Sequence, residues 1–575
     1  MVGLRKGISE ALATEPIART MQILIAPTGY GKTSSIHYIW KDISEKWGRV
    51  IHVLPLRAIV SDVASKAVER GISLEDVSYQ AAIEEMKKVR KSPYMLSRYV
   101  VTTYDSFTLS LYVAPIAELT RIHAHRDVGF LAACGGGVLL DEVHLVLATD
   151  HSDDTGKEEK KLFTTLLNMI KILSKYLGRP VVLLTATMPK DMIGSLVKEI
   201  CKEGLGVKLH VCLGERGIEY YRSLKTRVEC VEILEHGLDD EYRSLYEKYS
   251  KSVTTRVSDG NIADDFYTLV SDYSRIAIFC NTVERAVSVY REIKRRINTD
   301  ELKVFLVHGR IAEGDREDRI SEIDRLLREG GKVVVVATQV LEAGVDFDFD
   351  AVITEVAPPS ALIQRAGRAY RDIKERDAED KGVIIINISK ESLSSAKSVY
   401  PEELVCKVYS YFFQKLCNEG ISFDWRFAIG EPCFINLLEL SDGRTVGVDE
   451  EINSNLSKLL KIGLFEENIQ GFLREIEEKM EGSLIKDSAL IPLLTERGTV
   501  IVSLHYLRRR YQDVLEVEGD KVKAVFEKGE RYVNIQNLLK KPLTTLYSSS
   551  QADNPGKFLG LKVREGKYDQ EVGLL

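Results

Sequence analysis

A glycine-rich segment near the start of the sequence has the residue types and spacing of a phosphate-binding loop. Residues 26–33 read Ala-Pro-Thr-Gly-Tyr-Gly-Lys-Thr, after a short apolar run at 22–25 and before a helix-like segment. Glycines allow backbone N–H groups to surround phosphate oxygens, and the following helix N-terminus favours negative charge. Alanine stands at position 26, where the strict pattern has glycine, but it is small enough to keep the loop. The segment therefore predicts a nucleotide site.

Within this loop, Lys32 can reach the β- and γ-phosphates, and the Thr33 hydroxyl can bind Mg²⁺. The loop positions predicted to contact the nucleotide are Thr28, Gly29, Gly31, Lys32 and Thr33. The expected cofactors are ATP and Mg²⁺. The alternative is an ordinary turn between a strand and a helix.

A second segment combines an apolar strand with two carboxylates. Residues 138–144 read Val-Leu-Leu-Asp-Glu-Val-His. Carboxylates at the C-terminal end of a strand lie where α/β sheets bind ligands. We expect Asp141 to hold Mg²⁺, together with Thr33, and Glu142 to orient and deprotonate the attacking water. The alternative is a strand that ends in solvated acids.

Two threonines follow the next apolar strand, in the run Leu-Thr-Ala-Thr-Met-Pro at 184–189. Thr185 and Thr187 could form hydrogen bonds with the Asp-Glu-Val-His segment, including His144. Such bonds would couple the state of the nucleotide to movement. The alternative is a helix cap, a common role for threonine.

The second half of the chain contains an arginine-rich run, Gln-Arg-Ala-Gly-Arg-Ala-Tyr-Arg at 364–371. Its arginines are three residues apart, which predicts that they share a helical face. They would act as arginine fingers, with Arg368 and Arg371 foremost; the alternative is a solvated basic stripe. Gln364 is included in the predicted catalytic set. Just upstream, Gly344 and Asp346 are expected at the nucleotide, where Asp346 would take a ribose hydroxyl or tie two domains together.

These segments are spread over two blocks of alternating strands and helices, which predict an α/β fold with parallel sheets. The phosphate loop occurs in the first block alone, so the site is expected to be shared across a cleft. Predicted strands are 22–25, 50–54, 99–102, 138–140, 181–184 and 207–213 in the first block, and 276–280, 304–307, 333–337, 351–356 and 383–388 in the second.

The predicted domains are 1–213, 214–394 and 395–575, with a polar connector over 214–265. In the third, the patterns at 400–416 and 452–480 predict helices. The patterns at 499–506 and 514–526 predict strands. We expect this mixed α+β region to be an accessory domain, since it carries no motif of its own.

Composition excludes several classes of protein. The net charge of −7 means that any track for nucleic acid must be a local basic groove. None of the eight cysteines forms a C-x-x-C pair, so zinc sites lack support, and the cysteines are expected to stay reduced in the core. Neither a signal peptide nor a membrane-length apolar stretch is visible. A cytoplasmic protein is expected.

Taken together and in this order, the segments resemble the superfamily 2 helicases, and the Asp-Glu-Val-His box is similar to their DExH class. The resemblance implies two tandem RecA-like domains. It also implies contacts to nucleic acid from segments that lie beside the ATP motifs. The residues carried over for those contacts are Pro55, Arg57, Thr102, Thr103, Asp105, Asn281, His308, Gly309 and Thr338.

Two runs resemble more narrowly the CRISPR-associated helicases of type I interference systems. They are Cys-Asn-Thr-Val-Glu-Arg-Ala at 280–286 and the closing Lys-Tyr-Asp-Gln-Glu-Val-Gly-Leu-Leu at 567–575. This resemblance implies an ATP-dependent translocase that unwinds target DNA at an RNA-guided surveillance complex. Few residues precede the phosphate loop, and His505 is the one histidine after His308. Many members of this family carry a fused HD-type nuclease domain, which needs several metal-binding His and Asp residues, so the resemblance here implies the arrangement in which a separate HD-type nuclease subunit works with the helicase.

Two other functions stay open at this point. One is a general DNA-repair or RNA helicase, which would share the motor and differ in what recruits it. The other is an ATP-gated clamp that holds nucleic acid without unwinding it.

Overall fold

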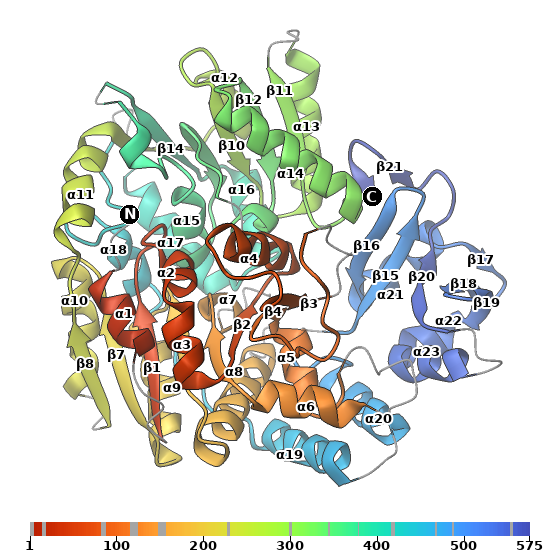
Figure 1. The fold of residues 1–575 in the computed structure, drawn as a ribbon. Helices are drawn as coiled ribbons and strands as arrows, with labels where there is room; N and C mark the ends of the chain where they lie inside the picture. The colour runs from red at the N-terminus through yellow and green to blue at the C-terminus, as the bar shows by residue number, and fades with distance from the viewer. Residues whose placement is uncertain are drawn as a thin grey trace.

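The fold is described from a computed structural model, in which two parallel sheets lie one above the other and a third sheet lies beside them (Figure 1). The structure describes residues 5–13, 19–81, 88–115, 125–147, 157–226, 230–297, 302–342, 346–377, 379–415, 420–465, 469–485, 488–551 and 556–574. The α/β fold with two large parallel sheets is as predicted.

The first sheet has eight parallel strands in the order β3-β4-β2-β5-β6-β1-β7-β8. Strands β2, β4, β5 and β6 are buried along their whole length, which explains their continuous apolar sequences. The strands are β1 (Thr20–Ile25), β2 (Val50–Leu54), β3 (Val77–Gln80), β4 (Tyr99–Thr103), β5 (Gly137–Leu140), β6 (Val181–Thr185), β7 (Gly206–Val211) and β8 (Val231–Glu235).

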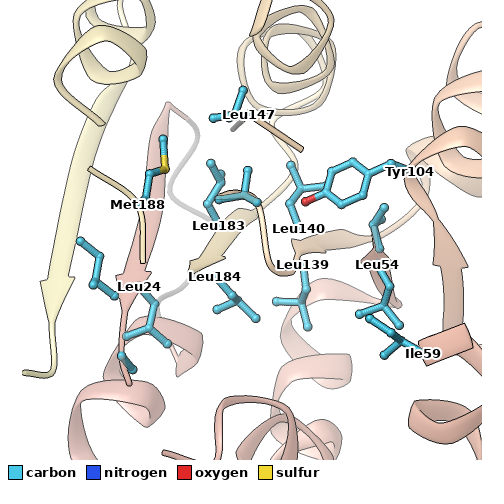
Figure 2. Close-up of a cluster of buried hydrophobic side chains, with 14 of the residues drawn as sticks. Leu24, Leu54, Ile59, Tyr104, Leu139, Leu140, Leu147, Leu183, Leu184 and Met188 are labelled. Carbon is cyan, nitrogen blue, oxygen red and sulfur yellow. The ribbon is translucent and has the colours of Figure 1, made fainter. Parts of the chain in front are cut away.

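Helices cover both faces of this sheet, and neighbouring residues of one strand point to opposite faces. In Figure 2, Leu140 and Leu183 lie on the side of Leu147, whereas Leu139 and Leu184 point to the other side. The helices are α1 (Lys6–Ala13), α2 (Lys32–Tyr38), α3 (Trp40–Trp47), α4 (Arg57–Glu69), α5 (Tyr104–Leu111), α6 (Arg126–Cys134), α7 (His144–Leu147), α8 (Lys157–Ile170) with its π-helical extension (Lys171–Tyr176), and α9 (Lys190–Lys202).

The second sheet has six parallel strands in the order β11-β12-β10-β13-β14-β9. The strands are β9 (Val253–Ser258), β10 (Arg275–Phe279), β11 (Lys303–Val307), β12 (Val333–Ala337), β13 (Ala351–Glu355) and β14 (Gly382–Asn387). The helices are α12 (Ile262–Tyr267), α13 (Val283–Arg296), α14 (Glu313–Arg328), α15 (Pro359–Ala366) and α16 (Lys390–Lys397), with short 3-10 turns at Gln339–Leu341 and Ile373–Glu375.

The prediction of a connector over 214–265 was wrong. This stretch contains α10 (Glu215–Arg222), a 3-10 turn (Ser223–Thr226), β8, α11 (Asp240–Ser252) and β9. Strand β8 extends the first sheet beside β7, and β9 is the edge of the second sheet beside β14. The crossover between the two sheets is therefore α11 and the residues that flank it.

The C-terminal region packs against both halves and carries a mixed sheet in the order β16-β15-β20-β18-β17, with β19 beside β18 (Figure 1). Its helices are α17 (Glu402–Phe413), α18 (Phe434–Glu439), α19 (Glu450–Phe465), α20 (Ile469–Met480), α21 (Leu504–Val514), α22 (Ile535–Lys540) and α23 (Pro542–Gln551). Its strands are β15 (Leu490–Thr495), β16 (Gly498–Ser503), β17 (Val517–Glu518), β18 (Lys521–Phe526), β19 (Gly529–Asn534), β20 (Phe558–Lys562), β21 (Tyr568–Asp569) and β22 (Gly573–Leu574).

Two expectations for this region need correction. The pattern at 452–480 is divided between α19 and α20, and the strand predicted at 499–506 ends at Ser503, where the Ser503 hydroxyl caps α21 by accepting from the Tyr506 N–H. A serine at the end of a strand can thus start a helix.

The cysteines also depart from expectation. Cys201, at the end of α9, forms a disulfide with Cys230, just before β8, and their Cα atoms are 6.0 Å apart. The prediction that all cysteines stay reduced was therefore wrong for this pair. None of the described helices is both long and apolar enough to cross a membrane.

Candidate nucleotide-binding site

The glycine loop between β1 and α2 has the geometry that phosphate binding requires. Gly29 and Gly31 adopt positive φ angles of 75° and 89°, which side chains disfavour. Lys32 begins α2 and is 7% exposed; its Nζ donates to the carbonyls of Ala26 (3.0 Å) and Pro27 (3.3 Å). The loop therefore holds its ammonium group inward, beside the helix N-terminus.

Asp141 follows β5 directly and faces Thr33. The Thr33 hydroxyl lies 3.4 Å from Asp141 Oδ2. Burial raises the pKa of Asp141, but a hydrogen bond from His52 and the charge of Lys32 outweigh burial, and the net shift is downward. A carboxylate that stays ionised, next to a hydroxyl, fits Mg²⁺, which prefers oxygen ligands.

Glu142 is held in an unusual backbone conformation beside Asp141. Its φ is +47°, and its N–H donates to Asp141 Oδ1 at 2.8 Å. Burial raises the pKa of the Glu142 carboxyl, while the charges of Lys32, Arg368 and Arg371 oppose that rise. Its Oε2 has no hydrogen-bond partner among the described residues. A partly buried carboxyl with a raised pKa at a cavity is a candidate general base.

His144 bridges the two α/β domains. Its Nδ1 lies 3.1 Å from Thr185 Oγ1, and its Nε2 lies 3.1 Å from the amide nitrogen of Gln364 in α15. Burial lowers the pKa of His144 to about 3, so the ring is neutral. An amide nitrogen only donates, so His144 Nε2 accepts and Nδ1 carries the proton toward Thr185. Thr187 is buried nearby, and its hydroxyl finds no hydrogen-bond partner among the described residues.

The second α/β domain contributes arginines and acids to the same cavity, which has a volume of about 970 Å³. Arg371 pairs with Asp346 through its guanidinium and donates its backbone N–H to Asp348 at 2.6 Å. Asp346 also pairs with Lys66 of α4 in the first domain. Arg371 and Lys66 together hold the pKa of Asp346 well below its usual range, although burial opposes them. The pair with Lys66 joins the two domains, which is one of the two predicted roles of Asp346; the contact with a ribose hydroxyl stays a prediction.

The prediction that three arginines share a helical face was wrong. Helix α15 ends at Ala366, and Arg368 and Arg371 lie in the loop beyond it. A Cβ on Gly367 would stand 2.9 Å from the Thr28 hydroxyl, so the backbone passes very close to the phosphate loop here. This close approach requires glycine at the point where the helix ends.

Arg365 points away from the cavity. It is fully buried, forms an ion pair with Glu342 at 2.7 Å, and donates to the hydroxyls of Thr354 and Tyr400, both at 3.0 Å. Its role in the fold is therefore structural. Arg368, in contrast, lines the cavity and donates to the Glu342 carbonyl at 2.6 Å.

The residues carried over as nucleic-acid contacts differ in accessibility. Gly309 is exposed, Arg57 and Asp105 are half-buried, and the others are buried: Pro55, Thr102, Thr103, Asn281, His308 and Thr338. Thr102 donates to the Gln80 carbonyl at 2.7 Å, and Thr103 caps α5. His308 Nε2 lies 3.1 Å from the carbonyl of Val572 in the C-terminal tail. Gly344 lies outside the described residues.

Several residues of the site were not found from the sequence. His52 interrupts the apolar strand β2 and lies 3.0 Å from Asp141, so a polar residue inside an apolar run was the available signal. Arg426, from the C-terminal region, donates to the carbonyls of Tyr370 (3.0 Å) and Arg371 (3.2 Å). No local pattern marked that arginine.

Comparison with known families agrees with this geometry. Residues 8–194 match the model of the DEAD/DEAH box helicase family, and residues 272–374 match the model for the C-terminal part of the CRISPR-associated nuclease/helicase Cas3. The first range contains the glycine loop and the Asp-Glu-Val-His segment, and the second contains the arginine loop.

Two relatives with low sequence identity to this chain are both Cas3 proteins. The chain is 24% identical over 386 residues to the CRISPR-associated nuclease/helicase Cas3 of Methanothermobacter thermautotrophicus, covering 64% of this chain and 40% of that protein. It is 24% identical to the CRISPR-associated helicase Cas3 of Thermoproteus tenax, covering 64% of this chain and 57% of that one. The chain thus spans less than two thirds of either relative.

The fold is also that of solved Cas3 structures. The crystal structure of T. fusca Cas3 with AMPPNP superimposes with a TM-score of 0.52 at 18% identity, over 80% of this chain and 55% of that one. The two large parallel sheets are therefore RecA-like domains. The chain thus combines a match to the DEAD/DEAH box helicases in its first part with a match to the C-terminal part of Cas3 in its second, on a fold shared with Cas3.

Proposed function

We propose that this chain is a DNA-stimulated ATPase that moves along single-stranded DNA and unwinds target DNA during type I CRISPR interference. The observation that carries the proposal is the cavity between the RecA-like domains. The glycine loop, Asp141 and Glu142 line it from one side, and Arg368 and Arg371 line it from the other. Opposed phosphate-binding and arginine-bearing walls suit ATP hydrolysis coupled to domain closure.

The residues of both walls of the cavity have proposed parts in the chemistry. Lys32 binds the β- and γ-phosphates, and Glu142 accepts a proton from the attacking water. Thr33 and Asp141 would hold Mg²⁺, which supplies positive charge to the phosphates when bound. Arg368 and Arg371 stabilise the charge that develops on the transferred phosphoryl group.

The DNA track is proposed to run over the two sheets, along the segments that contain Arg57, Asp105 and Gly309. These residues are the accessible members of the carried-over set. Contacts to phosphates would make the motor insensitive to sequence, and base pairing to a guide RNA would select the target. The recruiting partner is then an RNA-guided surveillance complex.

We also propose that a separate HD-type nuclease subunit cuts the DNA. The Thermoproteus tenax relative is named a helicase, whereas the Methanothermobacter relative is named a nuclease/helicase. Among the described residues, no group of three or more His, Cys, Asp and Glu side chains could hold a metal ion. The purified chain is expected to hydrolyse ATP and displace strands without cutting DNA.

One observation favours a second candidate function. The chain is also 24% identical to the ATP-dependent helicase Lhr-Core of Sulfolobus acidocaldarius, over 63% of this chain and 39% of that protein. A general DNA or RNA helicase would use the same ATP site.

The two candidates separate in a strand-displacement assay with DNA and RNA duplexes, tailed at the 3′ or 5′ end. We expect ATP-dependent displacement of DNA from a 3′ tail, and a higher ATPase rate with a guide-bound target complex. Equal activity on RNA without such a response would favour the general helicase. ATP hydrolysis without displacement of any duplex would favour a nucleic-acid clamp.

A further inference from the structure

A chain of polar side chains runs through the interior of the first RecA-like domain and ends on Asp141. Arg70 Nη1 lies 3.1 Å from His37 Nδ1, and His37 Nε2 lies 3.1 Å from the Tyr99 hydroxyl. The same hydroxyl lies 2.9 Å from His52 Nδ1, and His52 Nε2 lies 3.0 Å from Asp141 Oδ2. Four successive hydrogen bonds thus link the wall of the nucleotide cavity, where Arg70 lies, to the carboxylate at its floor.

The residues come from four elements. Arg70 follows α4, His37 is in α2, Tyr99 begins β4, and His52 is the middle residue of β2. Strand β2 lies between β4 and β5, so His52 can reach both Tyr99 and the end of β5. The three interior members are 0–1% exposed.

The donors and acceptors along this chain have one consistent direction. A guanidinium only donates, so Arg70 fixes His37 Nδ1 as an acceptor. Burial lowers the pKa of His37 to about 2, so the ring is neutral and its proton sits on Nε2, facing Tyr99. The Tyr99 hydroxyl receives that bond and gives its own proton to His52 Nδ1. His52 then carries its proton on Nε2 and donates to Asp141.

Buried polar groups cost free energy unless each is hydrogen-bonded, so apolar side chains would fill this core with less risk of such a cost. The effect of this chain of hydrogen bonds falls on one carboxylate. Asp141 Oδ1 accepts from the Glu142 N–H, and Oδ2 accepts from His52, so each oxygen of the carboxylate is held by a hydrogen bond from within the domain. The Thr33 hydroxyl, the other expected Mg²⁺ ligand, lies 3.4 Å from the same Oδ2.

We propose that Arg70, His37, Tyr99 and His52 are positioning residues that orient the Asp141 carboxylate toward a divalent cation. They act through Asp141, so they are not catalytic residues. The proposal rests on the proposed function, in which Asp141 and Thr33 hold Mg²⁺. Outer-shell partners of this kind are worth roughly 10–100-fold in metal affinity.

Two amide substitutions of His52 separate positioning from simple core filling. In His52→Gln the side-chain amide reaches the place of Nε2 and can still donate to Asp141. In His52→Asn the amide reaches only the place of Nδ1, so it can meet Tyr99 but not Asp141. Tyr99→Phe keeps the ring and removes the hydroxyl that sets the direction of the chain.

The control is a second buried histidine in the same sheet. His210 of β7 is 2% exposed and bonds to Gln22 Oε1 at 2.8 Å and to His236 at 2.9 Å, with no bond to Asp141. His210→Asn removes a buried histidine contact of the same kind without touching the chain.

The measurement is the dissociation constant of a fluorescent ADP derivative, mant-ADP, with excess Mg²⁺ and with excess EDTA. The ratio of the two constants reports the cation alone and needs no turnover. Circular dichroism and thermal melting check that each variant is folded. We expect His52→Asn and Tyr99→Phe to lower the Mg²⁺-dependent ratio by roughly tenfold, with affinity in EDTA unchanged. His52→Gln, which keeps the donor to Asp141 but loses the bond to Tyr99, should retain a higher ratio than His52→Asn, and His210→Asn should keep the ratio of the unsubstituted protein.

A folded Tyr99→Phe protein with an unchanged ratio overturns the proposal, as does an equal loss in His210→Asn. If His52→Asn does not fold, Tyr99→Phe and Arg70→Met, which removes the first donor, decide the matter. An unsubstituted protein whose affinity ignores Mg²⁺ would instead contradict the metal site in the proposed function, and the positioning role with it. The two failures are therefore distinguishable.

Discussion

The first RecA-like domain holds its cavity residues by bonds within the domain, whereas the second holds them in pairs that a ligand could exchange. Asp141 is anchored by His52 and by the Glu142 N–H, so its place does not depend on the other domain. Arg371, by contrast, is paired with Asp346, which is also bound by Lys66 across the cleft. The first wall is preorganised, and the second is built to respond to domain closure.

The largest expected effect comes from breaking the preorganised wall at its centre. Lys32→Ala should reduce ATP turnover to assay background and leave the fold intact, because the ammonium bonds to loop carbonyls rather than to a core. Steady-state phosphate release measures the effect, and Lys41→Ala on the exposed face of α3 is the matched control. Turnover at the control rate in a folded Lys32→Ala protein would remove the nucleotide site from this loop.

Glu142→Gln tests the base in the same wall. The substitution keeps the size of the side chain and removes the proton acceptor, so single-turnover hydrolysis should fall about 10³-fold, within the usual range for a general base. ATP should still bind and trap a closed state on single-stranded DNA. Hydrolysis near the unsubstituted rate would show that another group activates the water.

Arg371→Lys tests the responsive wall, and its effect should be smaller because lysine keeps the charge. We expect kcat to fall about 10²-fold, less than the full loss of an arginine finger, with ATP affinity nearly unchanged. Lysine lacks the planar fork that suits a phosphoryl group. Arg295→Lys, exposed on α13, is the control. An unchanged kcat at saturating DNA would transfer the role to Arg368, since Arg365 is buried in its pair with Glu342.

Gln364→Met should have the smallest effect, because it removes one hydrogen bond between the two walls and leaves the other residues of each wall in place. His144 would lose its interdomain partner and keep Thr185. DNA stimulation of the ATPase should fall about fivefold, the low end of typical coupling energies, and by more than basal turnover falls. Thr185→Val removes the bond on the other side of the ring. If the two variants affect stimulation equally, the bond between the domains has no special part in coupling.

The sequence predictions were right where the feature is built by neighbouring residues and wrong where it depends on parts of the chain that are far apart. The strand, glycine loop and helix around Lys32 are contiguous, and the structure has all three. The predicted arginine stripe was wrong. A spacing of three residues fits a helix, but α15 ends at Ala366, where the backbone at Gly367 comes close to Thr28 of the other domain. Strands β8 and β9 were not predicted. They follow one another in the chain, but β8 pairs with β7 in the first sheet and β9 pairs with β14 in the second, which the local sequence does not show.

The sequence by itself determined the parts that neighbouring residues can build: the phosphate loop, the paired carboxylates at the end of β5, and the two series of buried parallel strands. Only the tertiary structure decided which side chains meet. His52 and Tyr99 are 47 residues apart, and Lys66 and Asp346 are 280 apart, yet each pair is in hydrogen-bond contact. Hydrogen bonds form within narrow limits of distance and angle, and for residues so far apart in the chain those limits are met only once the sheets have packed.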